Sequence, residues 1–177
     1  MALREILTEP NKTLRQKSLK VENVDKDLQK LIDDMLETMY AAPGIGLAAI
    51  QIGVPKRVIV LDISSKDGPR NPMCFVNPEI ITTSQNNSTY EEGCLSVPGQ
   101  FAEIDRPDKC HIKYLDYYGE PKEIKAEGML ATCIQHEMDH LEGILFIDYL
   151  SKLKKTMIVK KLSKQKKQKK EIERIVV

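Results

Sequence analysis

Two histidines and a glutamate near the C-terminal third of the chain have the types and spacing of a metal-hydrolase centre. His136 and His140 are four residues apart, and on a helix this spacing places both imidazoles on one face, where they can hold one metal ion. Glu137 is rotated about 100° from His136 on such a helix, so its carboxylate would flank the ion and accept a proton from bound water. Only three histidines occur in the chain, so composition alone rarely produces this pattern. We therefore predict a metal-dependent hydrolase with Glu137 as general base.

A catalytic site of this kind usually has three protein ligands and one position for water, so a third ligand is needed. Cys133 lies on nearly the same helical face, but roughly 7 Å along the axis from the midpoint of the two histidines, which is too far for its side chain. Three other candidates are better explained without a metal: Cys74, Cys110 and His111. Cys94 lies among loop-forming residues over 91–99, which could present a thiolate to an ion. Spacing favours Cys94 but leaves the choice open.

The composition is that of one soluble globular domain. A chain of 177 residues usually has one hydrophobic core, and its 41% hydrophobic and 30% charged residues fit that class. No apolar run approaches the roughly 18 residues that span a membrane, and the first residues lack the pattern of a secretory signal. We therefore expect a cytoplasmic protein whose four cysteines are thiols rather than disulfides.

Apolar periodicity and turn residues predict the order of the elements. They are a helix over 25–40, strands over 57–63 and 74–81, a hairpin over 110–128, a helix over 128–141 that carries the histidines, and a helix from 151 onward. The segment 43–51 is expected to be a tight connection between a helix and a strand. This order predicts an α+β fold in which antiparallel strands pack around a central metal-bearing helix, with N-terminal and C-terminal helices.

The end of the chain is rich in lysine. Ten lysines lie within residues 151–170, although the formal net charge of the chain is only +1. Before the run KQKKQKK, four apolar residues recur at helical intervals: Leu153, Met157, Ile158 and Leu162. This pattern predicts a helix that frays into solvent at the lysine run. A solvated face is the commoner explanation of such a run, and binding to RNA phosphates is the alternative. We assign residues 1–150 to a catalytic domain and 151–177 to a helical extension of it.

Three motifs, taken together, resemble the ordered signature of the peptide deformylases. They are GIGLAAIQ at 44–51, EGCLSVPG at 92–99 and QHEMDHLEG at 135–143. The resemblance runs over most of the chain and is far more specific than the histidine motif, which zinc endopeptidases share. It implies removal of the formyl group from the N-terminal formyl-methionine of nascent polypeptides, with release of formate. Without the resemblance, a zinc endopeptidase is the leading alternative.

The resemblance also implies a role for each residue of the reaction centre. The ligands of one divalent ion match Cys94, His136 and His140. The ion is iron(II) in many members of the family, and zinc, nickel or cobalt are accepted by the same donors. In the implied mechanism a metal-bound hydroxide attacks the formyl carbon, and Glu137 passes the water proton to the departing amine. Gln51 and the Leu95 backbone N–H match the donors that stabilise the developing negative charge.

Further positions match the family's methionine pocket and the backbone edges that hold the peptide as an extended strand. These are Gly44, Ile45, Gly46, Leu47, Glu91, Glu92, Gly93, Met129 and Cys133. Glu92 and Arg106 also match a charged pair that steadies the Cys94 loop in relatives, with two solvated charges as the alternative. Ile50 replaces the small or polar residue often found before the glutamine, from which we expect altered packing and the same reaction.

The expected partners follow from the implied substrate. They are a formyl-Met peptide or nascent chain and, through the lysine tail, the ribosome, because an enzyme that acts on emerging chains gains from residence there. Neither a membrane nor DNA is expected, since a net charge of +1 is unlike that of a globally basic nucleic-acid binder. A binding module with a structural metal is a further alternative, but it requires a fourth ligand, for which the sequence offers no well-placed candidate.

Overall fold

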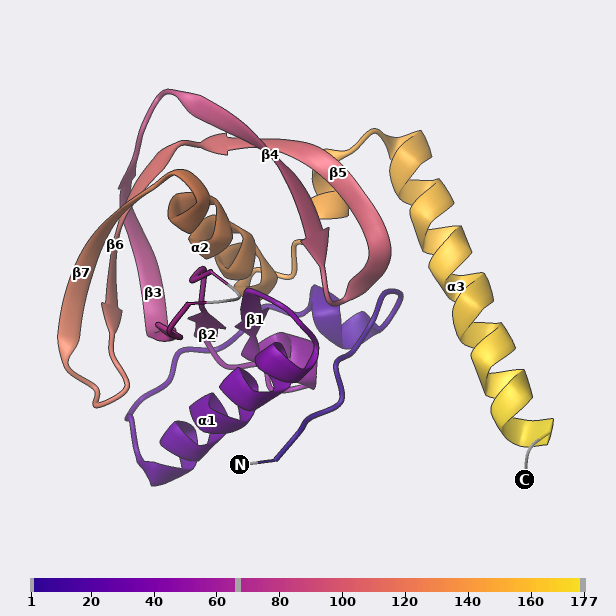
Figure 1. Ribbon diagram of the computed structural model, residues 1–177, viewed down its shortest axis with the longest axis horizontal. Helices are drawn as coiled ribbons and strands as arrows, with labels where there is room; N and C mark the ends of the chain where they lie inside the picture. The colour runs from indigo at the N-terminus through magenta and orange to yellow at the C-terminus, as the bar shows by residue number, and fades with distance from the viewer. Residues whose placement is uncertain (1, 66–67, 176–177) are drawn as a thin grey trace.

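The computed structural model describes residues 2–65 and 68–175, whose strands and helices surround one central helix, α2 (Figure 1). In chain order the elements are η1 (Lys12–Arg15), α1 (Lys26–Ala41), β1 (Gly46–Ala48), η2 (Ala49–Ile52), β2 (Val58–Leu61), β3 (Met73–Thr83), β4 (Asn87–Cys94), β5 (Val97–Pro107), β6 (Lys109–Leu115), β7 (Pro121–Glu127), α2 (Gly128–Leu141), η3 (Phe146–Tyr149) and α3 (Lys152–Ile175). The predicted α+β class, the three predicted helices and the β6–β7 hairpin are confirmed. Within the described residues, no helix is long and apolar enough to cross a membrane.

The strands form two antiparallel sheets. Five strands pair in the order β1-β2-β3-β6-β7, and β4 and β5 form a second, two-stranded sheet. Strand β2 is buried on both faces, with Val58 and Val60 in the cluster that contains α1, and Ile59 and Leu61 in the cluster that contains α2. Burial on both faces explains why this strand is a continuous apolar run instead of an alternating one.

Helix α1 covers the outer face of the larger sheet. Its first turn is capped by Asp25, whose side chain accepts a hydrogen bond from the Leu28 N–H, and the helix ends just before Pro43 and Gly44. Four of its side chains pack against the sheet and recur at helical spacing: Leu28, Ile32, Met35 and Met39. The same packing holds β1, the strand that follows α1 in the chain, beside the reaction centre.

Helix α2 lies between the two sheets (Figure 1). It begins directly after β7, at Gly128, whose φ of 57° is in the left-handed region that glycine adopts without strain. Ten of its fourteen residues are buried, so polar side chains on this helix lie in the interior of the molecule. A buried charged or imidazole group is costly unless it is paired or binds a ligand. The environment of α2 therefore favours a functional role for its histidines and glutamate.

The segment around Cys94 is not the loop that we predicted. Cys94 is the last residue of β4, and β4 and β5 pair along almost their whole length. Gly93 pairs with Phe101 and Cys94 with Val97, so residues 98–100 bulge out of β5. The glycines and prolines of this region hide the strands from pattern analysis, but they form the bulge that borders the reaction centre.

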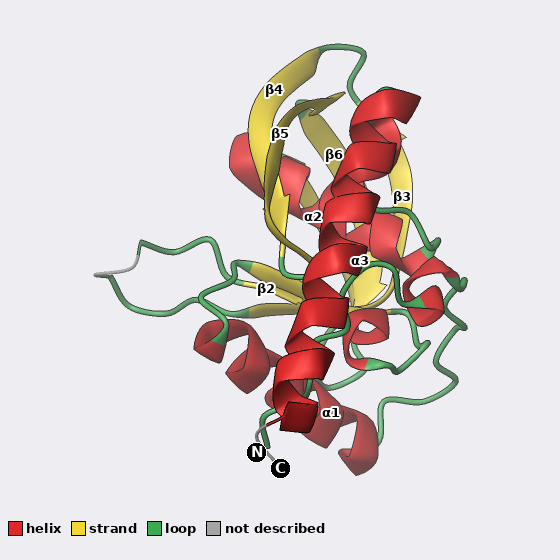
Figure 2. Cartoon of the chain, turned by 90° about the vertical axis from the view of Figure 1, so that its right-hand side faces the viewer, coloured by secondary structure: helices red, strands yellow, loops and turns green. Residues whose placement is uncertain are grey.

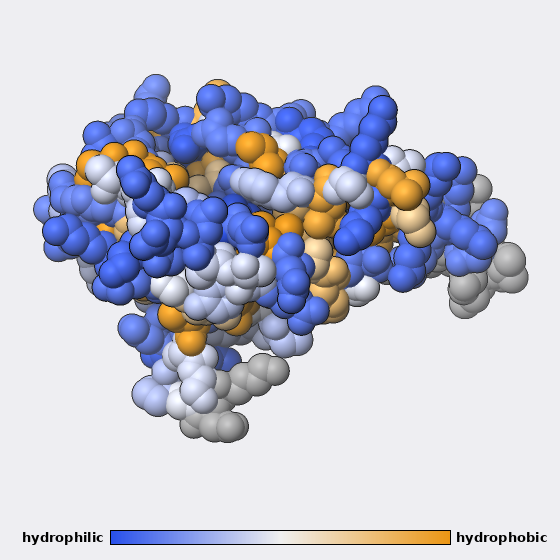
Figure 3. All heavy atoms as spheres, turned by 90° about the horizontal axis from the view of Figure 1, so that it is seen from above, coloured by the Kyte–Doolittle hydropathy of each residue, from blue (hydrophilic) through white to orange (hydrophobic). Residues whose placement is uncertain are grey.

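Helix α3 runs along the outside of the molecule (Figure 2). Leu162 is buried against β5 and η3, with Ile158 and Val159 half-buried beside it. Leu153 and Met157, predicted on the same apolar face, are instead 72% and 62% exposed. The helix also continues to Ile175, so the predicted loss of helical structure at KQKKQKK is wrong. From above, the α3 side of the molecule is mostly hydrophilic (Figure 3).

Candidate metal centre and active site

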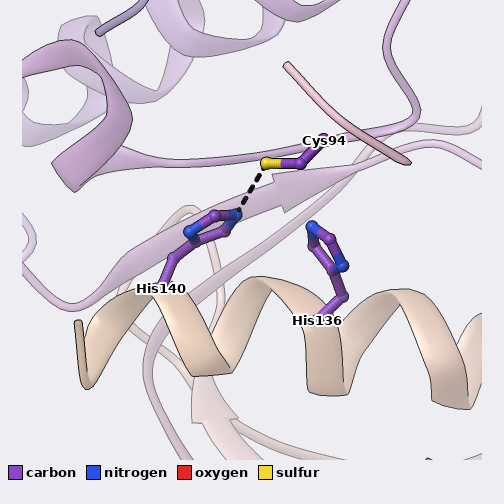
Figure 4. A group of neighbouring side chains, drawn as sticks. All are labelled: Cys94, His136 and His140. Atoms are coloured by element: carbon purple, nitrogen blue, oxygen red, sulfur yellow. Dashed lines mark hydrogen bonds between the residues drawn. The ribbon is translucent and has the colours of Figure 1, made fainter. Parts of the chain in front are cut away.

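Three potential metal ligands converge above one face of α2. Cys94 Sγ and one ring nitrogen each of His136 and His140 lie within 4.8 Å of one another, and the thiol approaches from the end of β4 (Figure 4). Cys94 Sγ lies 3.3 Å from His140 Nε2. Two imidazoles and a thiolate suit iron(II), zinc, nickel or cobalt, and three protein ligands leave a coordination position open. The residues present therefore fit one catalytic divalent ion.

The ring of His136 is oriented by Glu92. Its Nδ1 lies 2.8 Å from Glu92 Oε2, and a neutral ring that donates from Nδ1 keeps its lone pair on Nε2 for a metal. Burial lowers the pKa of His136, but contacts with Cys94 and Glu92 outweigh burial and raise this pKa well above its usual value. Glu92 and Arg106 are 6% and 4% exposed and form a bidentate pair at 2.6 and 3.0 Å. The alternative of two solvated charges is therefore wrong.

Glu137 is a buried carboxyl group beside the potential ligands. It is 5% exposed, and its Oε2 has no hydrogen-bond partner among the described residues. Its Oε1 lies against the backbone of Gly46, where an added Cβ would be only 2.3 Å away. Burial raises the pKa of Glu137 to about 7, which allows it to accept and donate a proton near neutral pH. An unpaired, buried acid in this position suits general acid–base chemistry.

Gln51 points its amide nitrogen at the same centre. Its Oε1 accepts a hydrogen bond of 2.8 Å from the Ala48 N–H, while its Nε2 donates to Ser96 Oγ at 3.0 Å and reaches Cys94 Sγ at 3.5 Å. These contacts fix the orientation of an amide that is 1% exposed. Ser96 is a residue that the sequence analysis missed, because its role depends on a contact between segments that are 45 residues apart.

A cavity of about 470 Å³ opens beside the centre. All of the predicted oxyanion donors and all but one of the predicted substrate-contact residues border this cavity. The exception is Leu47, which is fully buried in the core between α1 and the sheet. Ile45 and Met129 are partly exposed at its border, together with Phe101, which is 66% exposed. Phe101 and the bulge at 98–100 were missed by the sequence analysis, which treated this region as an undefined loop.

The cysteines and histidine that were set aside as ligands lie elsewhere or remain protonated. Burial raises the pKa of Cys133, which borders the cavity, to about 12, and that of Cys110 to about 11. Burial likewise raises the pKa of the Cys74 thiol to about 11. His111 lies on β6, where its Nε2 is 2.9 Å from Glu123 Oε2 on β7. None of them joins the cluster of potential ligands among the described residues.

The likeness to known proteins extends beyond the motifs to most of the chain. Residues 3–156 match the family model described as polypeptide deformylase. A peptide deformylase of Pelagibacter ubique is 67% identical over 166 residues, which cover 94% of this chain and 96% of the relative. The crystal structure of the Ehrlichia chaffeensis peptide deformylase with actinonin is 46% identical, with a TM-score of 0.89, and covers 93% of this chain and 98% of that one.

A more distant structure agrees with the same assignment. The class I type b peptide deformylase of Acinetobacter baumannii with Met-Ala-Ser bound is 34% identical, has a TM-score of 0.79, and covers 84% of this chain and 99% of that one. These similarities extend over fold, sequence and nearly the full length of the proteins compared. This chain therefore belongs to the peptide deformylase family, whose members are metal-dependent hydrolases.

Proposed function

We propose that this chain hydrolyses the formyl group from the N-terminal formyl-methionine of nascent polypeptides, producing formate and a free amino terminus. The observation that carries the proposal is the placement of the buried Glu137 carboxyl group, whose Oε2 has no partner among the described residues, beside three potential metal ligands at the border of one cavity. The Met-Ala-Ser bound to the Acinetobacter enzyme begins with methionine, as the product of this reaction would.

The ion would be held by Cys94, His136 and His140, and we propose iron(II) as the native metal, with zinc, nickel or cobalt as substitutes. When bound, such an ion supplies Lewis-acid chemistry, because it lowers the pKa of water and polarises a carbonyl oxygen. A thiolate ligand makes an iron(II) centre sensitive to oxidation. Metal analysis of protein purified without oxygen would identify the native ion.

Glu137 would move the proton in both halves of the reaction. It would first accept a proton from the attacking water and then deliver that proton to the departing amine nitrogen, so that the amine leaves neutral. Gln51 and the Leu95 backbone N–H would donate hydrogen bonds to the formyl oxygen as negative charge develops there. The contacts of Gln51 with Ala48 and Ser96 hold its amide in place before the substrate arrives.

The peptide would bind as an extended strand between two sheet edges. Strand β1 is the last strand of the larger sheet, and β4 is bonded only to β5, so both have an edge free of any other described strand. Gly44 to Gly46 and Glu91 to Gly93, which belong to these edges or flank them, border the cavity. Backbone hydrogen bonds to such edges are independent of the peptide's sequence. The methionine side chain would occupy the apolar part of the cavity near Ile45, Met129 and Cys133.

The deciding experiment is a formate-release assay on a formyl-Met-Ala-Ser peptide with protein purified and kept without oxygen. We expect equal amounts of formate and Met-Ala-Ser, and no release of acetate from the acetylated peptide. The family assignment already separates this chain from zinc endopeptidases. Cleavage of internal peptide bonds without release of formate would nevertheless overturn the proposed reaction.

We further propose that α3 docks on the ribosome through its lysines. Five exposed lysines lie together over residues 160–167 of the helix: Lys160, Lys161, Lys164, Lys166 and Lys167. No described side chain of the helix borders the cavity, so docking would leave the reaction centre accessible. Because Leu162 packs on the domain, replacement of the five lysines by glutamine is a cleaner test than deletion of residues 151–177. Ribosome affinity in moderate salt should fall while hydrolysis of the small peptide is unchanged; unchanged affinity would contradict docking.

A further inference from the structure

The contacts of His136 continue beyond Glu92. Glu92 accepts hydrogen bonds from the Nε and Nη2 atoms of Arg106, and this fork holds the carboxylate in the position from which it meets the His136 ring. Arg106 is itself 4% exposed. The orientation of its guanidinium is set by the groups that accept its hydrogen bonds. The precision with which Glu92 orients the ring therefore depends on what holds the rest of Arg106.

Asp139 holds the other side of the Arg106 guanidinium. Arg106 Nη1 donates to Asp139 Oδ2 at 2.8 Å, so the buried arginine lies between two carboxylates, one on β4 and one on α2. Asp139 lies three residues after His136 and directly before His140. Its side chain is 19% exposed and does not join the cluster of potential ligands among the described residues.

Tyr149 completes the chain of contacts. Its hydroxyl donates to the same Asp139 Oδ2 at 2.8 Å, and its ring lies 4.9 Å from the Arg106 guanidinium carbon. Tyr149 is the last residue of η3, and α3 begins three residues later, at Lys152. A continuous series of hydrogen bonds thus connects Tyr149, just before α3, with the potential metal ligand His136.

We propose that Asp139 and Tyr149 are positioning residues of the metal centre, which hold Arg106 and Glu92 so that the His136 ring keeps the orientation needed to bind the ion. This inference rests on the metal ligands of the proposed function. The simpler explanation is that the pair only anchors η3 to α2, because Tyr149 is 51% exposed. The two explanations differ in whether loss of the pair changes the metal centre or only the stability of the fold.

Cobalt(II) provides a test that does not depend on turnover. Full-length protein is loaded with cobalt, and the release of cobalt to a chelator is timed for the wild type, Tyr149→Phe and Asp139→Asn. Removal of a residue that orients a ligand typically weakens metal binding by about 10-fold to 100-fold. Asp139 and Tyr149 act two and three hydrogen-bonded contacts beyond Glu92, so their effect should be smaller. We therefore expect release to accelerate by about 3-fold to 10-fold, with altered cobalt absorption bands.

The matched control is Tyr117→Phe. The Tyr117 hydroxyl donates to Asp33 Oδ2 at 3.3 Å, so this variant also loses a tyrosine–aspartate hydrogen bond, but one that lies outside the metal centre. It should lower the unfolding temperature of the metal-free protein about as much as Tyr149→Phe and leave cobalt release unchanged.

Wild-type release rates and wild-type spectra in both Tyr149→Phe and Asp139→Asn would show that the pair only anchors η3, and would overturn the inference. A wild-type chain that takes up no cobalt would overturn the metal ligands and this inference with them. Normal cobalt binding without formate release would instead overturn the proposed reaction alone.

Discussion

Gly46 shows how a residue without a side chain can determine the position of the carboxyl group for which we propose a catalytic role. An added Cβ would lie 2.3 Å from Glu137 Oε1 and 2.8 Å from its Cδ, so the carboxyl group occupies the space that any other residue would fill. In this buried position the pKa of Glu137 is raised to about 7. Both residues could be identified from the sequence, but Gly46 only as a backbone contact for substrate. Its packing against Glu137 joins segments that no local pattern connects.

Glu137→Gln should retain the metal and lose most of the turnover. The amide is similar in shape but cannot accept the water proton, and loss of a general base typically costs about 10²-fold to 10⁴-fold in rate. The check is metal content and formate release of the purified variant, with Glu123→Gln on the exposed part of β7 as control. Near-normal turnover in a metal-replete Glu137→Gln protein would contradict the role.

Gly46→Ala should displace the Glu137 carboxyl group without removing it. A displacement of about 1 Å at a catalytic group can cost about 100-fold in rate, so we expect a large fall in kcat with the metal content unchanged. Gly68→Ala is the control, because a Cβ there meets only ordinary contacts beyond 3.4 Å. Equal turnover in the two variants would show that the carboxyl group does not depend on this close approach.

Among the elements, the N-terminal segment and α1 are joined by one buried carboxylate. Asp34 accepts hydrogen bonds from the Ala2 N–H at 2.7 Å and from Arg4 Nε and Nη2 at 3.0 and 2.7 Å. Helical periodicity predicted α1, since that signal is local, but it could not reveal these partners about 30 residues away. Strands β4 and β5 were missed for a different reason: they pair as a hairpin, but its turn-forming residues imitate a loop.

Asp34→Asn should weaken the fold in a pH-dependent way. The hydrogen bonds from Arg4 lower the pKa of Asp34 despite its burial, so its stabilising effect is present above the pKa of the unfolded chain, about 3.9, and is lost as pH falls below it. We expect an unfolding temperature about 3–8 °C lower at pH 7 and a smaller difference below about pH 4. Asp27→Asn, exposed on the same helix, is the control in thermal unfolding across this pH range. A constant difference at all pH values would contradict the ionic contribution.

Across the whole molecule, the reaction centre is the place where the two sheets meet α2. Cys94 belongs to the smaller sheet, Gln51 follows the edge of the larger one, and the histidines come from the helix between them. The fold class, the helix and the motif residues could be predicted from sequence, because periodicity and family motifs are readable there. Cys94 was singled out as the third ligand by the family resemblance, while the contacts of Ser96, Asp139 and Tyr149 required the tertiary structure.

Removal of the metal should therefore destabilise the whole fold. An ion that binds only to the folded chain raises the free energy of unfolding. The increase grows with the logarithm of the ratio of ion concentration to Kd, and it is about 2.7 kcal/mol when the concentration is 100 times the Kd. For a chain of this size, that energy corresponds to an unfolding temperature about 5–10 °C higher. A chelator should lower the unfolding temperature of the wild type by this amount and leave Cys94→Ala unaffected. Equal effects on both proteins would place the ion elsewhere.

The strand that carries Cys94 also restricts where the length of the chain can change. Glu92 and Cys94 are two residues apart on β4, and both reach α2, so they share one face of the strand. One inserted or deleted residue within Asn87–Cys94 would turn one or both of these side chains to the opposite face. Gln85, exposed in the turn before β4, lies outside this constraint. Natural length variation near the metal centre is accordingly expected in that turn, and not in the strand.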